Sequence, residues 1–96
     1  MMSDPTLLVL ASLADGDKHG YAMITDIQDF AGVRLGPGTL YGAITRLESS
    51  GWIRPVDSED RRRPYRLTVE GRRHLREQLA GLDQLVKVGR RRLKQA

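Results

Sequence analysis

The chain has 96 residues, no cysteine and a formal net charge of +4. This length allows one domain with a single small core, and the lack of cysteine excludes disulfides, thiolate zinc sites and cysteine nucleophiles. The longest apolar run, residues 7–11, is too short to span a membrane, and the N-terminus lacks the pattern of a secretory signal. We therefore expect one cytoplasmic domain without a membrane partner.

The charge is distributed unevenly along the chain. Residues 1–50 contain three basic and six acidic side chains, whereas residues 51–96 contain thirteen basic and six acidic ones. The two halves therefore carry −3 and +7, an asymmetry that is typical of a protein with one face for a polyanion. Basic residues that only maintain solubility would give the same totals, so the charge alone leaves both interpretations open.

The start of the chain predicts a short helix and a turn. Asp4 and Pro5 form a helix start, because an aspartate side chain accepts exposed N–H groups and proline fits the first turn. Apolar residues continue this helix to Ala14, and the Asp-Gly-Asp sequence of residues 15–17 signals a turn.

A second helix is expected over residues 20–31, where apolar side chains recur every three or four positions. Gly32 suits the left-handed residue that follows a helix. The expected buried stripe of this helix comprises Tyr21, Ile24, Ile27, Phe30 and Ala31.

A third helix is expected to begin at Pro37, whose missing N–H costs nothing in a first turn, and to end at Gly51. Residues 33–35, just before it, have the composition of one small strand. The buried stripe of the third helix comprises Leu40, Ala43, Ile44 and Leu47, and its small, polar and basic opposite side carries Thr39, Gly42, Thr45, Arg46 and Ser49.

The rest of the chain predicts a β-hairpin and a long helix. Residues 52–56 and 64–67 have the composition of strands, and a charged loop lies between them. Pro55 indicates that the first of these is an edge strand. Thr68 then caps the last helix, with Glu70 in its acidic first turn.

The last helix carries a heptad pattern of apolar residues with spacings of four, three, four and seven. Its glycines weaken intrinsic helicity, so the helix needs a packing partner, and its end over residues 90–96 is expected to fray. The candidate dimerisation residues are Leu75, Leu79, Leu82, Val86 and Leu93.

Three short helices followed by a charged hairpin predict a winged helix-turn-helix. The expected fold is mainly α with a small β-hairpin wing (α+β), with a DNA-binding domain at residues 4–67 and a C-terminal dimerisation helix at residues 68–93. An α-helix fits the major groove of duplex DNA, and free N–H groups at its start can hold a phosphate. The candidate DNA-binding residues of the third helix are Pro37, Gly38, Thr39, Tyr41, Thr45 and Arg46. The alternative is that Tyr41 and Arg46 are ordinary residues at the boundary between the core and the surface.

The hairpin tip adds a second candidate surface. Arg61, Arg62 and Arg63 are adjacent on a short loop, so they can reach phosphates or a narrow minor groove. The acidic residues before them (Asp57, Glu59 and Asp60) would instead cancel this field if they paired with the arginines. The preceding candidate recognition helix favours the DNA-binding interpretation.

The sequence gives little support to a catalytic or metal-binding site. His19 and His74 lie on different predicted elements, and no serine or carboxylate is spaced to join either one. The glycines around Pro37 lack the lysine and the spacing of a phosphate-binding loop. We therefore expect no enzymatic activity, no metal and no cofactor. We expect Trp52 to fill the core at the start of the wing, and His74 to lie on the surface.

Several short motifs in fixed order resemble the PadR family of bacterial transcriptional regulators, in particular its compact subfamily with a single C-terminal dimerisation helix. The resemblance covers roughly residues 6–82. The motifs are His19-Gly20-Tyr21, Gly38-Thr39-Leu40-Tyr41, Arg46-Leu47-Glu48, Gly51-Trp52-Ile53, Arg62-Arg63-Pro64-Tyr65 and Leu67-Thr68-Val69-Glu70-Gly71.

This resemblance implies a sequence-specific regulator, in most members a repressor, that binds a palindromic operator in double-stranded DNA as a homodimer. His19, beside a turn glycine, is interpreted as a structural or phosphate-facing residue, and His19 and Tyr21 are both DNA-binding candidates. Since some members of the family bind apolar molecules and others respond to phenolic compounds, the resemblance also implies a small apolar or phenolic effector that could release the protein from DNA. The family often has serine where Gly36 stands, so the third helix is expected to have a weaker cap. A winged-helix module that binds proteins without specific DNA binding is the alternative.

Overall fold

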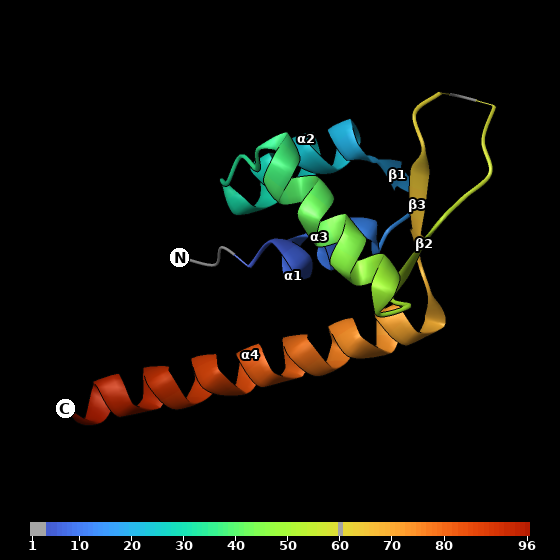
Figure 1. Cartoon of the computed structure of the whole chain (residues 1–96). Helices are drawn as coiled ribbons and strands as arrows, with labels where there is room; N and C mark the ends of the chain where they lie inside the picture. Colours follow the sequence, from blue (N-terminus) through green and yellow to red (C-terminus); the bar gives the residue numbers. More distant parts are fainter. Residues whose placement is uncertain (1–3, 60) are drawn as a thin grey trace.

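The computed structural model describes residues 4–59 and 61–96. Three helices form a compact group, with a small sheet along one border and a long fourth helix that leaves the group (Figure 1). The elements are α1 (Pro5–Leu13), β1 (Lys18–His19), α2 (Gly20–Ala31), α3 (Pro37–Ser49), β2 (Ile53–Pro55), β3 (Pro64–Leu67) and α4 (Val69–Gln95). The predicted α+β fold with a hairpin wing is confirmed.

Local chemistry explains where the helices begin and end. Asp4 Oδ1 accepts the N–H of Thr6 at 3.0 Å and so caps α1. Gly32 ends α2 with φ of 68°, a left-handed conformation that favours glycine. Gly36 gives α3 no side-chain hydrogen bond, as the missing serine predicts, and Thr68 Oγ1 caps α4 by accepting the N–H of Gly71 at 3.0 Å.

The sheet is antiparallel, with β3 between β1 and β2. Pro55 lies on the edge strand β2, as predicted, and pairs with Tyr65. The strand expected at residues 33–35 is wrong: this segment is an irregular connection that places Leu35 in the core. The third strand is Lys18–His19, which is too short to produce an alternating pattern in the sequence.

The core lies between α1, α2, α3 and the sheet, and Leu75 of α4 closes it. Four α3 side chains predicted to be buried are at most 2% exposed. The predicted stripe of α2 is partly wrong, because Tyr21 is 66% and Phe30 is 52% exposed. Met23 joins Ile24 and Ile27 in the core instead.

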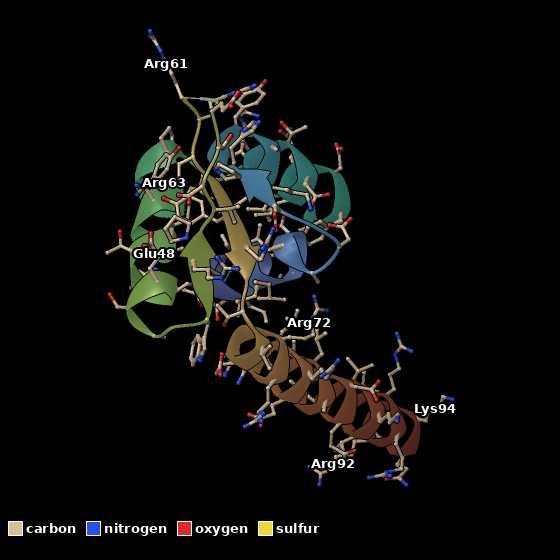
Figure 2. All side chains as sticks on the ribbon, turned by 90° about the vertical axis from the view of Figure 1, so that its right-hand side faces the viewer. Glu48, Arg61, Arg63, Arg72, Arg92 and Lys94 are labelled. Carbon is tan, nitrogen blue, oxygen red and sulfur yellow. The ribbon has the colours of Figure 1, made fainter. Side chains whose placement is uncertain are left out.

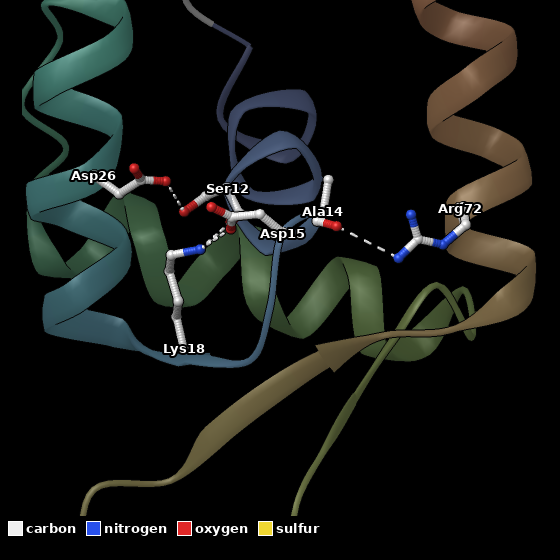
Figure 3. Close-up of polar contacts among 6 residues, drawn as sticks. All are labelled: Ser12, Ala14, Asp15, Lys18, Asp26 and Arg72. Atoms are coloured by element: carbon white, nitrogen blue, oxygen red, sulfur yellow. Dashed lines mark hydrogen bonds and ion pairs between the residues drawn. The ribbon is translucent and has the colours of Figure 1, made fainter.

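Polar contacts tie the first helix to its neighbours (Figure 3). The buried Ser12 hydroxyl donates to Asp26 Oδ2 of α2 at 2.7 Å. Lys18 Nζ donates to the Ser12 carbonyl and to the Asp15 carboxylate, so β1 is held beneath the end of α1. Arg72 of α4 donates to the Ala14 carbonyl at 3.4 Å, which links the fourth helix to the same corner.

The fourth helix has 27 residues and extends about 40 Å at 1.5 Å per residue. It continues to Gln95, through most of the segment that was expected to fray. Only Gly71 and Leu75 are buried, which leaves most of the helix without a partner in this chain. Among the described residues, no helix has both the length and the apolar character needed to cross a membrane.

Candidate nucleic-acid interface

The outer face of α3 carries the candidates predicted for DNA contact. Because α3 directs Leu40, Ala43, Ile44 and Leu47 inward, the helical period places Gly38, Gly42, Thr45 and Ser49 on the opposite side. Thr39 and Arg46 flank one edge of this outer stripe, and Tyr41 and Glu48 flank the other. Pro37, Gly38, Thr39, Tyr41, Thr45 and Arg46 are all exposed.

Two side chains of this face have defined surroundings. Thr45 Oγ1 donates to the carbonyl of Tyr41 at 2.9 Å, so its proton is used and its lone pairs and methyl group face outward. Arg46 Nη1 lies 3.6 Å from the position that a Cβ on Gly42 would occupy. The Arg46 guanidinium thus lies back along the helix, where a side chain at Gly42 would make only an ordinary van der Waals contact with it.

The positive charge of Arg46 also acts on Asp4, the residue that caps α1. A hydrogen bond from the Thr6 hydroxyl is the main reason that the pKa of Asp4 lies below its ordinary value. The nearby Arg46 guanidinium acts in the same direction. The cap of α1 therefore remains ionised at neutral pH.

The start of α2 meets α3 at close range. His19 caps α2, because its Nδ1 accepts the N–H of Ala22 at 3.3 Å. A Cβ on Gly20 would lie 2.5 Å from the Tyr41 hydroxyl oxygen, so glycine is needed for this approach. The two motifs that contain Gly20 and Tyr41 thus form one contact, which the sequence did not indicate.

A cavity of about 380 Å³ opens between this contact and the wing. Tyr65 is buried beneath it, whereas Tyr21 and Tyr41 are 66% and 51% exposed. None of the described residues that line it is acidic. Its lining consists of His19, Gly20, Tyr21, Tyr41, Arg61, Arg62, Arg63 and Tyr65.

The wing arginines approach this cavity from the hairpin. Figure 2 shows Arg61 extending from the wing tip and Arg63 lower on the hairpin. Arg61 and Arg63 also line a second, smaller cavity together with Asp57. Asp60, one of the acids expected to compete for these arginines, lies outside the described residues.

Arg66 on β3 has a different role from the wing arginines. Its Nε and Nη2 donate to the two carboxylate oxygens of Asp17 at 3.0 and 2.7 Å, a bidentate pair. This hydrogen bond is the main reason that the pKa of Asp17 lies below its ordinary value. Arg66 therefore joins the turn after α1 to the central strand, and its charge is already matched.

The predicted dimerisation residues divide into two groups. Leu75 is only 5% exposed and packs in the core of its own chain, so its placement on a dimer surface is wrong. Leu79 and Leu93 are 49% and 79% exposed, Val86 is 46% exposed and Leu82 is half-buried. We call these last four residues the apolar strip of α4.

Comparisons with known proteins agree with this geometry. The profile of the transcriptional regulator PadR-like family matches residues 9–77. Transcriptional regulator Rv3488 of Mycobacterium tuberculosis is 39% identical over 85 residues, covering 84% of this chain and 78% of the relative.

Two further matches extend the comparison. An uncharacterized 37.1 kDa protein in transposon TN4556 of Streptomyces fradiae is 45% identical over 83 residues. The match covers 86% of this chain but only 24% of that relative's length. A PadR family transcription regulator from hypervirulent Clostridium difficile superposes with a TM-score of 0.84 at 26% identity, covering 93% of this chain and 97% of that one.

Proposed function

Since the chain belongs to the PadR-like family of transcriptional regulators, we propose that it binds specific sites in duplex DNA as a homodimer. The family consists of regulators rather than enzymes. The observation that carries the proposal is the joint surface of the α2 start, the outer face of α3 and the wing arginines. We call α3 the recognition helix from here on.

The cavity beside the recognition helix suits a backbone phosphate. Arginine side chains bind phosphate oxygens with charge-assisted hydrogen bonds, and tyrosine hydroxyls add neutral donors. Arg61 and Arg63 provide cations on the wing side, and Tyr41 provides a hydroxyl on the α3 side. Such contacts position a protein on DNA without reading its sequence.

The outer face of the recognition helix suits the major groove. Its outermost stripe contains two glycines, so the backbone can approach base edges closely. Thr45 can accept a base amino group or touch a thymine methyl, because its proton is bonded to Tyr41. Arg46 can reach a guanine edge from one flank. We assign base reading to Thr39, Thr45 and Arg46.

The apolar strip of α4 supports the dimer. Three of its four side chains are exposed and Leu82 is half-buried, on a helix that buries only two residues in its own chain. Pairing such strips removes apolar surface from water and gives the helix the partner that its glycines require. A symmetric dimer would present two recognition helices about 34 Å apart, one turn of DNA.

The family resemblance carries the finer parts of the proposal. It supports a palindromic operator, because a two-fold dimer reads two inverted half-sites. It also supports repression and release by a small apolar or phenolic effector. The relative from Mycobacterium tuberculosis is named a transcriptional regulator, which agrees with the regulatory role.

Two substitutions test the division between base and phosphate contacts. We expect Arg46→Ala to change the preferred sequence, because it removes a base contact. We expect Arg61→Ala, which removes a cation from the wing side of the cavity, to weaken binding to all sequences. It should also lower the slope of log K against log salt by about 1.8, because each phosphate contact contributes about 0.9 and a dimer loses two.

The measurement is DNA binding by fluorescence anisotropy between 50 and 300 mM salt, concentrations that bracket the physiological range of about 150 mM. A random-sequence duplex serves as the non-specific reference. If Arg61→Ala changed the preferred sequence and left the salt slope intact, the assignment of the wing to phosphate would be wrong. If the folded wild-type protein bound neither duplex, a protein partner would become the better hypothesis for this surface.

A further inference from the structure

Trp52 stands between the recognition helix and α4. Its backbone N–H donates to the backbone carbonyl of Leu47 in α3 at 3.0 Å. Its backbone carbonyl accepts the N–H of Thr68, just before α4, at 3.0 Å. Its indole stacks on the imidazole of His74, with ring centroids 3.6 Å apart and planes 12° from parallel. Trp52 therefore touches both the end of α3 and the second turn of α4. Trp52 was expected to fill the core and His74 to lie on the surface. Both residues are instead half-buried, with their rings stacked on each other.

The backbone at this junction is closely packed. A Cβ added to Gly71 would overlap the Trp52 carbonyl oxygen and lie 2.8 Å from its carbon. Thr68 Oγ1 also donates to the carbonyl of Gly51 at 2.7 Å. These contacts fix the point at which α4 begins. All of them lie at its first turn, so they leave its direction to contacts farther along.

The helix α4 lies against α1, but it buries little of its own surface there. Beyond Leu75, no residue of α4 is fully buried. Leu75 is held in the core, and Arg72 reaches the Ala14 carbonyl with a long hydrogen bond of 3.4 Å. A single buried leucine permits a helix to pivot, whereas two stacked rings resist a tilt that would separate their planes.

We infer that the stack of Trp52 on His74 sets the angle between the recognition helix and α4, and thereby the half-site spacing that the dimer accepts. The angle concerns one chain alone. The spacing rests on the dimeric DNA-binding function proposed above. Trp52 and His74 are positioning residues, because neither belongs to the surface assigned to DNA.

The geometry makes a small change of angle matter. Val86, in the middle of the apolar strip, is about 22 Å along the helix from Gly71 at 1.5 Å per residue. A tilt of about 10° would therefore move it by about 4 Å. One base step along a DNA strand is about 3.4 Å. Loss of the stack is thus expected to change the accepted spacing by about one base pair.

The test measures the angle and the spacing separately. The chain has no cysteine, so Ser49→Cys and Gln84→Cys place two spin labels, one on each helix. Labelled protein is diluted into an excess of unlabelled protein, so that pulsed electron spin resonance reports only distances within one chain. In parallel, unlabelled protein selects among inverted repeats whose spacers differ by single base pairs.

Four variants are compared with the wild-type protein. His74→Ala and His74→Gln remove the second aromatic ring, and one of them suffices if the other fails to fold. His74→Phe restores an aromatic ring, and Gln78→Ala is an exposed control on the same helix. Trp52 is the chain's single tryptophan, so its fluorescence reports whether the stack is lost.

We expect His74→Ala to broaden the distance distribution and to accept spacers one base pair shorter or longer, with unchanged half-site sequence. His74→Phe should restore both properties, and Gln78→Ala should resemble the wild type. An altered tryptophan emission with an unchanged distance distribution would overturn the inference. A broadened distribution in a protein that selects no inverted repeat would confirm control of the angle and refute the dimeric DNA-binding function on which the spacing rests.

Discussion

Replacing Gly71 with alanine should destabilise the fold, although the same change elsewhere in α4 should stabilise it. A Cβ at this position would overlap the Trp52 carbonyl oxygen and lie 2.9 Å from Leu67 Cδ1. The carbonyl cannot turn aside easily, because it accepts the N–H of Thr68 at 3.0 Å. The backbone of the wing and the first turn of α4 must therefore separate.

The magnitude follows from three contributions. Overpacking of a tight contact costs about 3 kcal/mol when backbone must move, and the weakened hydrogen bond costs about 1 kcal/mol more. Alanine recovers about 1 kcal/mol of helix propensity. The net loss of about 3 kcal/mol corresponds to a fall in Tm of roughly 12–24 °C for a domain of this size.

Gly81→Ala is the matched control, because a Cβ there would meet nothing within 4 Å. It should gain about 1 kcal/mol and raise Tm by roughly 4–8 °C. Thermal unfolding followed by circular dichroism, at one protein concentration, measures both variants. Shifts of the same sign, or a Tm for Gly71→Ala within a few degrees of the wild type, would refute the packing at this junction.

Three further predictions concern stability and assembly. Thr68→Ala should lower the free energy of unfolding by about 1 kcal/mol because α4 loses its cap, whereas Thr68→Ser should keep most of it; equal losses in chemical denaturation would contradict this. The pKa of Asp17 is depressed by its hydrogen bond from Arg66, so its stabilising contribution is present above the unfolded pKa of about 3.9 and is lost as the pH falls through the folded value. Between pH 5 and pH 2, which lie on either side of about 3.9, the Tm of Asp17→Asn should therefore fall less than that of the wild type. An equal fall in Tm over this range would refute the prediction. Leu79→Asp and Leu82→Asp should give folded monomers in sedimentation, because these side chains are not in the core of a single chain; a folded dimer from both variants would exclude this interface.

Local signals in the sequence were sufficient for most of the fold. Caps, proline and glycine act on their immediate neighbours, so the starts of α1 and α4 and the end of α2 could be predicted from Asp4, Thr68 and Gly32. The strand β3 was predicted at its observed bounds. The strand β1 was missed, because a segment of two residues has no period and owes its structure to pairing with β3.

Contacts between distant segments were beyond local reasoning. The heptad pattern assigned Leu75 to a dimer surface, because spacing alone does not distinguish packing within a chain from packing between chains. Tyr21 was expected in a buried stripe but lies exposed at the rim of the cavity. The stack of Trp52 on His74 joins residues that no period relates, so only the folded chain reveals it.

The central claim is specific DNA binding by a symmetric dimer. Its most direct test is selection by the purified wild-type protein from a randomised duplex library at about 150 mM salt, near physiological ionic strength. Specific binding by a symmetric dimer predicts recovery of one inverted repeat whose half-site centres lie about 10 base pairs apart. Recovery of no common sequence by protein that is folded and dimeric would contradict it.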